Sequence, residues 1–334
     1  MIRDPDVPDF VHDFANLASA RLGATVTQVT DEFFADRARM LADAPAVFIP
    51  DKYDDNGKWM DGWETRRRRN GGNDWAVVKL AMPGVVKGVD IDTSHFTGNF
   101  PPAASLEGCR SDNEPDAKTA WTPLLPITSL GSSRHHVFAV AAAEPVNFVR
   151  LQIFPDGGVA RLRIYGAPVP TWKPGDVKTV HELSALKNGG GIVAFNDAHY
   201  GSVASLLTQG RGLNMGDGWE TRRRREPGND WIIVALGAAG VPETIEVDTA
   251  FYKGNFPDRC SVQAALVEQG TRASIITQSQ FWPQLLPEQK LAADKVHTFG
   301  ADLIAKLGPV THVKLNIFPD GGVSRLRVFG KLAP

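Results

Sequence analysis

One glutamate and four consecutive arginines stand together in a nine-residue stretch that occurs twice in this chain. Residues 61–69 read Asp-Gly-Trp-Glu-Thr-Arg-Arg-Arg-Arg, and the same nine residues return at 217–225. A guanidinium group binds a carboxylate through two parallel hydrogen bonds, and a glutamate in a pocket can exchange protons with a ligand. Each copy is therefore a candidate site for a small anionic molecule and for acid–base chemistry on it.

As a strand, residues 63–69 would place alternate side chains on opposite faces. Glu64, Arg66 and Arg68 then share one face. Since an uncompensated buried charge is strongly destabilising, at least one face has to meet carboxylates of the protein or an anionic ligand. An arginine ladder paired with Asp and Glu, and an arginine that holds a substrate carboxylate, are both compatible with this pattern.

Three further blocks recur beside this stretch. They are Asn-Asp-Trp at 73–75 and 229–231, Gly-Asn-Phe-Pro at 98–101 and 254–257, and Phe-Pro-Asp-Gly-Gly at 154–158 and 318–322. Asn99 and Asn255 can exchange hydrogen bonds with an amide-like ligand, although a capped turn would use an asparagine equally well. We expect Trp75 to anchor the core and Asp156 to form a turn.

The histidines offer one candidate acid. His95 lies four residues before Asn99, but the second copy has Phe251 at the equivalent position, so a partly buried aromatic is the alternative role. The adjacent His135 and His136 would point to opposite faces of a strand. Because the chain also has no HxH, HExxH or CxxC pattern, no P-loop, no GxSxG motif and no dinucleotide fingerprint, we expect neither a metal nor a cofactor.

Composition and charge narrow the classes of function. The 334 residues allow two domains of about 150 residues, and the net charge of -2 argues against a nucleic-acid or other polyanion binder. Cys109 and Cys260 occupy non-equivalent positions in the two copies, which favours a reducing compartment over a disulfide framework. No apolar run approaches the roughly 20 residues that span a bilayer, and the acidic, proline-containing start is not typical of a secretory signal. We expect a cytoplasmic protein that binds no membrane.

The matching blocks define a duplicated domain. They lie 156 to 166 residues apart, and the first copy carries ten extra residues within 43–60. A repeat of this length is a domain rather than a solenoid unit. We expect a lead-in at 1–16, a first repeat at 17–168, a proline-rich linker at 169–176 and a second repeat at 177–334.

Strand patterns dominate both copies. Residues 75–80 form a short apolar run followed by proline, and residues 89–93 alternate apolar and acidic side chains, so we expect two separate strands there. Residues 148–154 and 161–166 are expected as strands on either side of a turn. Frequent Gly and Pro with little helical periodicity predict an all-β fold of two tandem β-sandwiches of the jelly-roll type.

Taken together, the Gly-Trp-Glu-Thr-Arg-Arg, Asn-Asp-Trp, Gly-Asn-Phe-Pro and Phe-Pro-Asp-Gly-Gly blocks resemble the duplicated unit of the allantoicase (allantoate amidinohydrolase) family. The resemblance extends from about Leu17 to Gly330. It implies two jelly-roll domains of the galactose-binding-like type, which arose by internal duplication. It also implies hydrolysis of allantoate to ureidoglycolate and urea in purine (allantoin) degradation, but it assigns no catalytic residues.

Allantoate is a small carboxylate whose α-carbon bears two ureido groups, so its hydrolysis needs a cation, an acid and a base. We expect Arg66 or Arg68 to hold the carboxylate. Asn99 would position the ureido groups, and Glu64 would exchange protons. Two neighbouring cations would lower the pKa of Glu64, which favours its role as the base and leaves His95 as the acid. The second copy offers Arg222, Arg224, Glu220 and Asn255 for the same roles.

Two other functions remain open. Tandem β-sandwiches also serve as carbohydrate-binding modules, but these expose aromatic side chains and work in secretory contexts, neither of which the sequence indicates. A scaffold that uses its arginines to assemble subunits is the second alternative, and it is compatible with catalysis. We therefore expect a homo-oligomeric enzyme whose partner is the small molecule allantoate.

Overall fold

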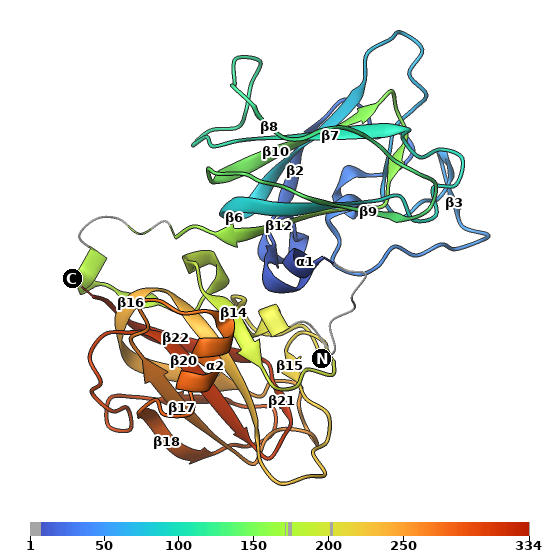
Figure 1. Cartoon of the computed structure of the whole chain (residues 1–334). Helices are drawn as coiled ribbons and strands as arrows, with labels where there is room; N and C mark the ends of the chain where they lie inside the picture. Colours follow the sequence, from blue (N-terminus) through green and yellow to red (C-terminus); the bar gives the residue numbers. More distant parts are fainter. Residues whose placement is uncertain (1–7, 171, 173–175, 201–202, 334) are drawn as a thin grey trace. The chain divides into compact units, whose positions relative to one another are not determined.

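The computed structural model describes residues 8–170, 172, 176–200 and 203–333. The chain divides into two compact units, Pro5–Val169 and Pro170–Pro334, each of which holds one copy of the repeated blocks (Figure 1). Both units consist mainly of antiparallel strands, which confirms the expected all-β fold of two tandem β-sandwiches. Among the described residues, no helix is long and apolar enough to cross a membrane.

The first unit is organised around one long central strand, β6. Its main sheet runs in the order β1-β12-β6-β10-β7-β8, and β2 and β9 also pair with β6. The elements are α1 (Asp9–Asp13), β1 (Ala15–Asn16), η1 (Ala20–Leu22), β2 (Thr25–Val29), η2 (Arg37–Leu41), β3 (Tyr53–Asp54), β4 (Gly57–Lys58), β5 (Trp63–Glu64), β6 (Asp74–Asp92), β7 (Ala103–Cys109), β8 (Thr122–Ser129), β9 (His135–Ala139), β10 (Val146–Phe154), β11 (Gly158–Val159) and β12 (Arg161–Pro168).

The second unit has a main sheet of the same topology as that of the first. Its main sheet runs β13-β22-β16-β20-β17-β18, and β14 and β19 also pair with the central strand β16. The elements are η3 (Asp176–Lys178), β13 (Val180–Glu182), η4 (Leu186–Asn188), β14 (Gly191–Phe195), η5 (Val203–Leu207), β15 (Trp219–Glu220), β16 (Asp230–Asp248), β17 (Arg259–Ala265), α2 (Arg272–Gln278), β18 (Gln284–Lys290), β19 (Val296–Phe299), β20 (Val310–Phe318), β21 (Gly322–Val323) and β22 (Arg325–Leu332).

The strand β6 is continuous over 19 residues, whereas the sequence predicted two separate strands at 75–80 and 89–93. Its first half pairs with β2 and β10, and its second half pairs with β9 and β12. The partners change near Pro83 and Gly84. Proline lacks an amide hydrogen but adopts extended φ values, so it interrupts the ladder without ending the strand. The prediction of separate strands was therefore wrong.

A fully buried tryptophan from the nine-residue stretch anchors the core of each unit. The indole nitrogen of Trp63 donates to the carbonyl oxygen of Asp31 at 2.7 Å, and Trp219 makes the equivalent bond to Asp197 at 2.8 Å. Trp75, the expected anchor, is only partly buried. An indole satisfies its single donor and buries a large apolar area, so Trp63 and Trp219 fix their strands against the core.

The aspartate that opens the nine-residue stretch pairs with a buried arginine. The Arg161 guanidinium, 2% exposed, lies 2.7 Å from an Asp61 carboxylate oxygen, and Arg325 and Asp217 are 2.9 Å apart. Backbone carbonyl oxygens accept further hydrogen bonds from both arginines. A buried guanidinium requires this compensation, so the pair holds β12 against the segment that carries the candidate glutamate.

Regular strand structure ends at Glu64, whereas the sequence predicted a strand through residue 69. Beyond Glu64, side-chain carboxylates accept hydrogen bonds from the backbone amides. The Arg66 amide donates to Asp31 at 2.6 Å, and the Arg68 amide donates to Asp156 at 2.7 Å. These acceptors replace a neighbouring strand, so residues 65–69 form an extended wall rather than part of a sheet.

Candidate functional site

Glu64 lies at the end of β5 beside a cavity of about 1060 Å³ in the first unit. The residue is 9% exposed. The cavity is lined by the arginine run 66–69 and by three loops, which contribute Asp31 and Phe33, Asn99 and Phe100, and Pro155 to Gly157. The repeated blocks of the first copy thus converge on one hollow.

The blocks Gly-Asn-Phe-Pro and Phe-Pro-Asp-Gly-Gly hold each other in place. The Gly158 amide donates to the Asn99 carbonyl oxygen at 2.8 Å. Gly157 has a φ of 145°, and a Cβ there would lie only 2.6 Å from the Pro101 nitrogen. Only glycine tolerates both the conformation and the close approach. The turn therefore fixes the loop that carries Asn99, while Thr65 accepts the Gly157 amide at 3.1 Å.

The structure brings Glu64 and Asn99 together, as the sequence placed them in one site. The Asn99 Nδ2 donates to the Glu64 Oε1 at 2.6 Å, and the Asn255 Nδ2 donates to the Glu220 Oε1 at 2.5 Å in the second unit. Because Oε1 accepts this bond, a proton on the Glu64 carboxyl would sit on Oε2. The asparagine therefore orients the carboxyl group as well as lining the cavity.

The pKa of Glu64 is raised, whereas the sequence predicted that neighbouring arginines would lower it. Burial is the main cause of the increase, the hydrogen bond from Asn99 opposes it, and the negative charge of Asp54 adds to it. The prediction was wrong because the arginine heads turn towards other carboxylates. A buried carboxyl with a raised pKa is suited to donate a proton.

Arg66 and Arg68 line the cavity, and both are paired with acids of the protein. The Arg66 Nη2 lies 2.7 Å from Asp31, and the Arg68 Nη2 lies 2.9 Å from the buried Asp74. Burial of Asp31 acts to raise its pKa, but the bonds from Arg66 hold the pKa below its usual value. Arg68 also donates to the Gly71 carbonyl oxygen at 3.3 Å, so its guanidinium is engaged on both sides.

Arg67 and Arg69 also line this cavity, and the sequence singled out neither. Both are exposed, and no carboxylate of the described residues forms an ion pair with them. The strand pattern held no signal for them, because it placed these two arginines on the face opposite Glu64, whereas the strand ends at Glu64 and all four arginines line one cavity. Two guanidinium groups thus remain available to an anionic ligand.

His95 lies outside the residues that line the cavity. Its Nε2 is 3.1 Å from the Ala46 carbonyl oxygen, and its ring stacks on Phe48 with centroids 5.8 Å apart. The backbone φ of His95 is 69°, so the chain turns at this residue. The short spacing to Asn99 therefore does not bring the imidazole to Glu64.

The equivalent hollow of the second unit is divided into two cavities. One, of about 580 Å³, is lined by Glu220 and Asn255, and the other, of about 270 Å³, is lined by Arg224 and Asp230. Arg222 lies 3.7 Å from Asp197, and Arg224 lies 2.7 Å from Asp230. The same residue types thus surround a smaller space.

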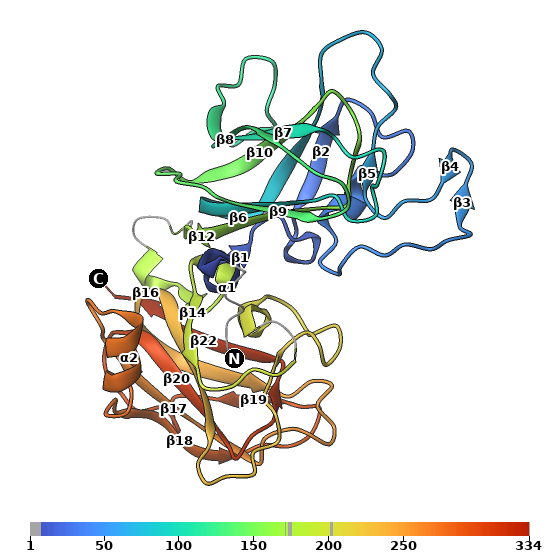
Figure 2. The same cartoon turned by 45° about the vertical axis from the view of Figure 1, so that its right-hand side comes forward.

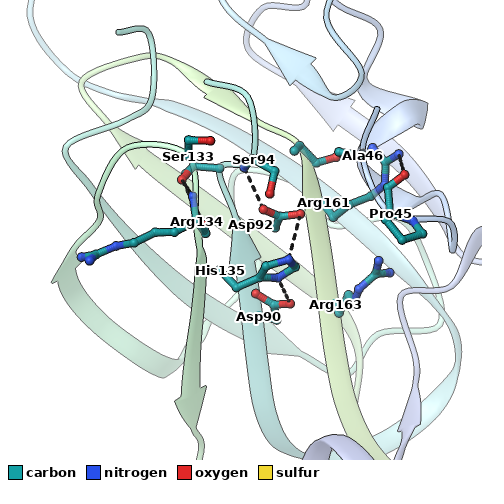
Figure 3. A network of polar contacts seen from close by, with 12 residues as sticks. Pro45, Ala46, Asp90, Asp92, Ser94, Ser133, Arg134, His135, Arg161 and Arg163 are labelled. Carbon is teal, nitrogen blue, oxygen red and sulfur yellow. Dashed lines mark hydrogen bonds and ion pairs between the residues drawn. The ribbon is translucent and has the colours of Figure 1, made fainter. Parts of the chain in front are cut away.

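A second polar network of the first unit lies away from the cavity, between β9 and β6 (Figure 3). The His135 Nδ1 is 2.8 Å from Asp90, and its Nε2 is 3.7 Å from Asp92. Burial raises the pKa of Asp90, while the bond from His135 and its charge lower it. No group of three metal-ligating side chains with suitable geometry occurs in the described part of the chain, and Cys109 and Cys260 are buried free thiols.

Comparison with known proteins decides the family. The family model described as the allantoicase repeat matches residues 15–169 and 181–333. The chain belongs to the allantoicase family. Each allantoicase repeat contains one copy of the glutamate–asparagine pair, Glu64 with Asn99 and Glu220 with Asn255.

Curated relatives and a solved structure are similar over nearly their whole length. A probable allantoicase 1 of Burkholderia mallei is 58% identical over 99% of this chain and 98% of its own, and a probable allantoicase of Ralstonia nicotianae is 59% identical over 98% of each. The crystal structure of allantoicase from Saccharomyces cerevisiae covers 95% of this chain and 92% of its own, with 33% identity and a TM-score of 0.78. The allantoicase fold is thus shared over both repeats.

Proposed function

We propose that this protein hydrolyses allantoate to ureidoglycolate and urea in the cavity beside Glu64 and Asn99. The activity follows from the full-length similarity to probable allantoicases. The choice of cavity depends on one observation. A buried carboxyl with a raised pKa faces a hollow whose wall carries two guanidinium groups without a carboxylate partner among the described residues.

Glu64 acts first as the acid and then as the base. The neutral carboxyl donates its Oε2 proton to a ureido nitrogen as the bond from that nitrogen to the α-carbon breaks and urea leaves. The nitrogen lone pair of the remaining ureido group stabilises the α-carbon. The Glu64 carboxylate then takes a proton from water as the water oxygen bonds to that carbon. Ureidoglycolate forms, Glu64 is neutral again, and such proton transfer contributes about 100-fold to 10,000-fold in rate.

Arg67 and Arg69 hold the substrate carboxylate. The sequence proposed Arg66 or Arg68 for this role, but Arg68 is engaged by Asp74 and a backbone carbonyl. The Arg66 side chain is mostly exposed, but its guanidinium is ion-paired with Asp31. A ligand at Arg66 would therefore share the guanidinium with that carboxylate. A fork-shaped guanidinium without a competing carboxylate binds an incoming carboxylate more strongly.

Asn99 positions the ureido groups. Its Nδ2 is used by Glu64, which leaves the Oδ1 to accept a hydrogen bond from a ureido N–H. This bond would hold the leaving nitrogen beside the Glu64 carboxyl. Because Glu64 supplies both proton transfers, the mechanism needs no second acid, and His95 takes no part in it.

The test measures urea released from allantoate by the purified protein and by the Glu64→Gln variant. We expect the wild type to release urea and the variant to lose at least about 100-fold in kcat with an unchanged thermal unfolding midpoint. A folded wild type that releases no urea would favour the carbohydrate-binding alternative. Full turnover by the folded variant would exclude Glu64 from the reaction.

Two further expectations belong to this proposal. The free, buried thiols of Cys109 and Cys260 support a cytoplasmic location, because oxidising compartments favour disulfides. A homo-oligomer is expected as the working form, and light scattering of the purified chain would measure its mass. A monomer at working concentration would contradict this expectation without affecting the chemistry.

A further inference from the structure

We infer that the two repeats have different roles, and that allantoate is turned over in the first repeat alone. This inference rests on the proposed function of Glu64. It comes from three differences between cavities that are built from the same repeated blocks: the size of the space beside the glutamate, a hairpin near the glutamate and the charge of the lining.

The first difference is the size of the space beside the glutamate. In the first repeat one cavity of about 1060 Å³ is lined by Glu64 and all four arginines, whereas in the second repeat the cavity beside Glu220 measures about 580 Å³ and is lined by three of the four, without Arg224. In the second repeat, Glu226 lies 3.5 Å from Arg224, where the first repeat has Asn70 after its arginine run. Glu226 and Arg224 both line the smaller cavity of about 270 Å³, so among the described residues the first repeat offers the larger single space beside its glutamate.

The second difference is a hairpin near the glutamate. The ten-residue insertion of the first repeat contains the β3–β4 hairpin, which projects outward on the right of the view, on the side of β5 (Figure 2). Asn56, at the hairpin turn, donates to the Phe33 carbonyl oxygen at 2.8 Å, and Phe33 lines the cavity. Asp54 of the hairpin is close enough to act on Glu64 electrostatically.

The described part of the second repeat has no counterpart of this hairpin, and its glutamate is less buried. Glu220 is only half-buried, and the neighbouring Tyr200 is 59% exposed. Exclusion of water strengthens the hydrogen bonds and charges that act on a substrate. A ligand beside Glu64 is therefore better shielded from water than a ligand beside Glu220.

The third difference is the charge of the lining. Four arginines and four carboxylates line the first cavity, whereas four arginines and six carboxylates line the two cavities of the second repeat. The additional acids are Glu226 and Asp258. Asp258 is compensated by ion pairs with Lys290 and Arg259, whereas Glu226 pairs with Arg224 and adds a negative charge beside the arginine run. An anionic substrate is thus favoured in the first repeat.

The experiment compares Glu64→Gln with Glu220→Gln in the full chain, because the two substitutions are chemically identical. Urea release from allantoate gives kcat and KM, and thermal unfolding verifies that both variants fold. We expect Glu64→Gln to lose at least about 100-fold in kcat and Glu220→Gln to stay within about twofold of the wild type.

The remaining outcomes separate the inference from the proposed function. Equal losses in both variants would overturn the division of roles but keep the glutamate chemistry. A loss in Glu220→Gln alone would place the reaction in the second repeat and overturn the inference. Full activity in both folded variants would overturn the proposed acid, and the inference that rests on it.

Discussion

In both repeats a tryptophan and an aspartate of the nine-residue stretch are fixed by the same contacts, to a backbone carbonyl and to a buried arginine. The repeats diverge at the cavity, where Asn70 is replaced by Glu226 and where, among the residues that the structure describes, the β3–β4 hairpin occurs in the first repeat alone. Residues that are identical in the two copies therefore build much of the scaffold. The residues that differ between the copies decide which cavity accepts a ligand. Substitutions made in matched pairs test this separation.

The largest effect is expected from the buried ion pairs of the scaffold, and it should be equal in the two repeats. Asp61→Ala and Asp217→Ala each leave a buried guanidinium without its carboxylate, which costs about 3–5 kcal/mol in the free energy of unfolding. Denaturant unfolding followed by tryptophan fluorescence measures both variants. A lower free energy of unfolding in one variant but not in the other would show that the two scaffolds are not equivalent.

A smaller and unequal effect is expected from the arginines without carboxylate partners. The double variant Arg67→Ala with Arg69→Ala removes the groups proposed to bind the substrate carboxylate. A charge-assisted hydrogen bond contributes about 1.5–3 kcal/mol, so we expect its loss to raise KM roughly 10-fold to 100-fold. The matched control is Arg223→Ala with Arg225→Ala, for which KM should change less than about twofold. Equal increases in KM would show that both cavities bind the substrate.

The exchange of one residue at the arginine run should have a moderate effect. Asn70→Glu brings to the first cavity the carboxylate that Glu226 places in the second, and we expect KM to rise about twofold to fivefold for an exposed charge. The rise should shrink at high salt because exposed charges are screened. The control Glu226→Asn should leave KM unchanged. A salt-independent rise would indicate a steric effect instead.

The smallest effect concerns pH. The negative charge of Asp54 contributes to the raised pKa of Glu64, so Asp54→Asn should lower that pKa. An acid works while it is protonated and fails as the pH rises through its pKa, so the alkaline limb of the kcat/KM profile should move to lower pH. A purely structural role of the hairpin would change the height of the profile and leave the limb in place.

The sequence predicted much of this arrangement, because the repeated blocks defined the two β-sandwiches and placed Glu64 and Asn99 at one site. The partners of the arginines were not predictable from a strand pattern. The strand ends at Glu64, and carboxylates distant in the chain, such as Asp31, direct the following residues. The pKa of Glu64 was predicted with the wrong sign because proximity in sequence was taken as proximity in space.

The continuity of β6 has a consequence for how each repeat opens. This single strand shares hydrogen bonds with β2, β9, β10 and β12, so its amides belong to both halves of the first sandwich at once. Neither half of the sandwich can separate from β6 while the other half keeps its backbone hydrogen bonds to this strand. Amide protons along β6 should therefore exchange with deuterated solvent only when the whole repeat unfolds, as a single cooperative unit.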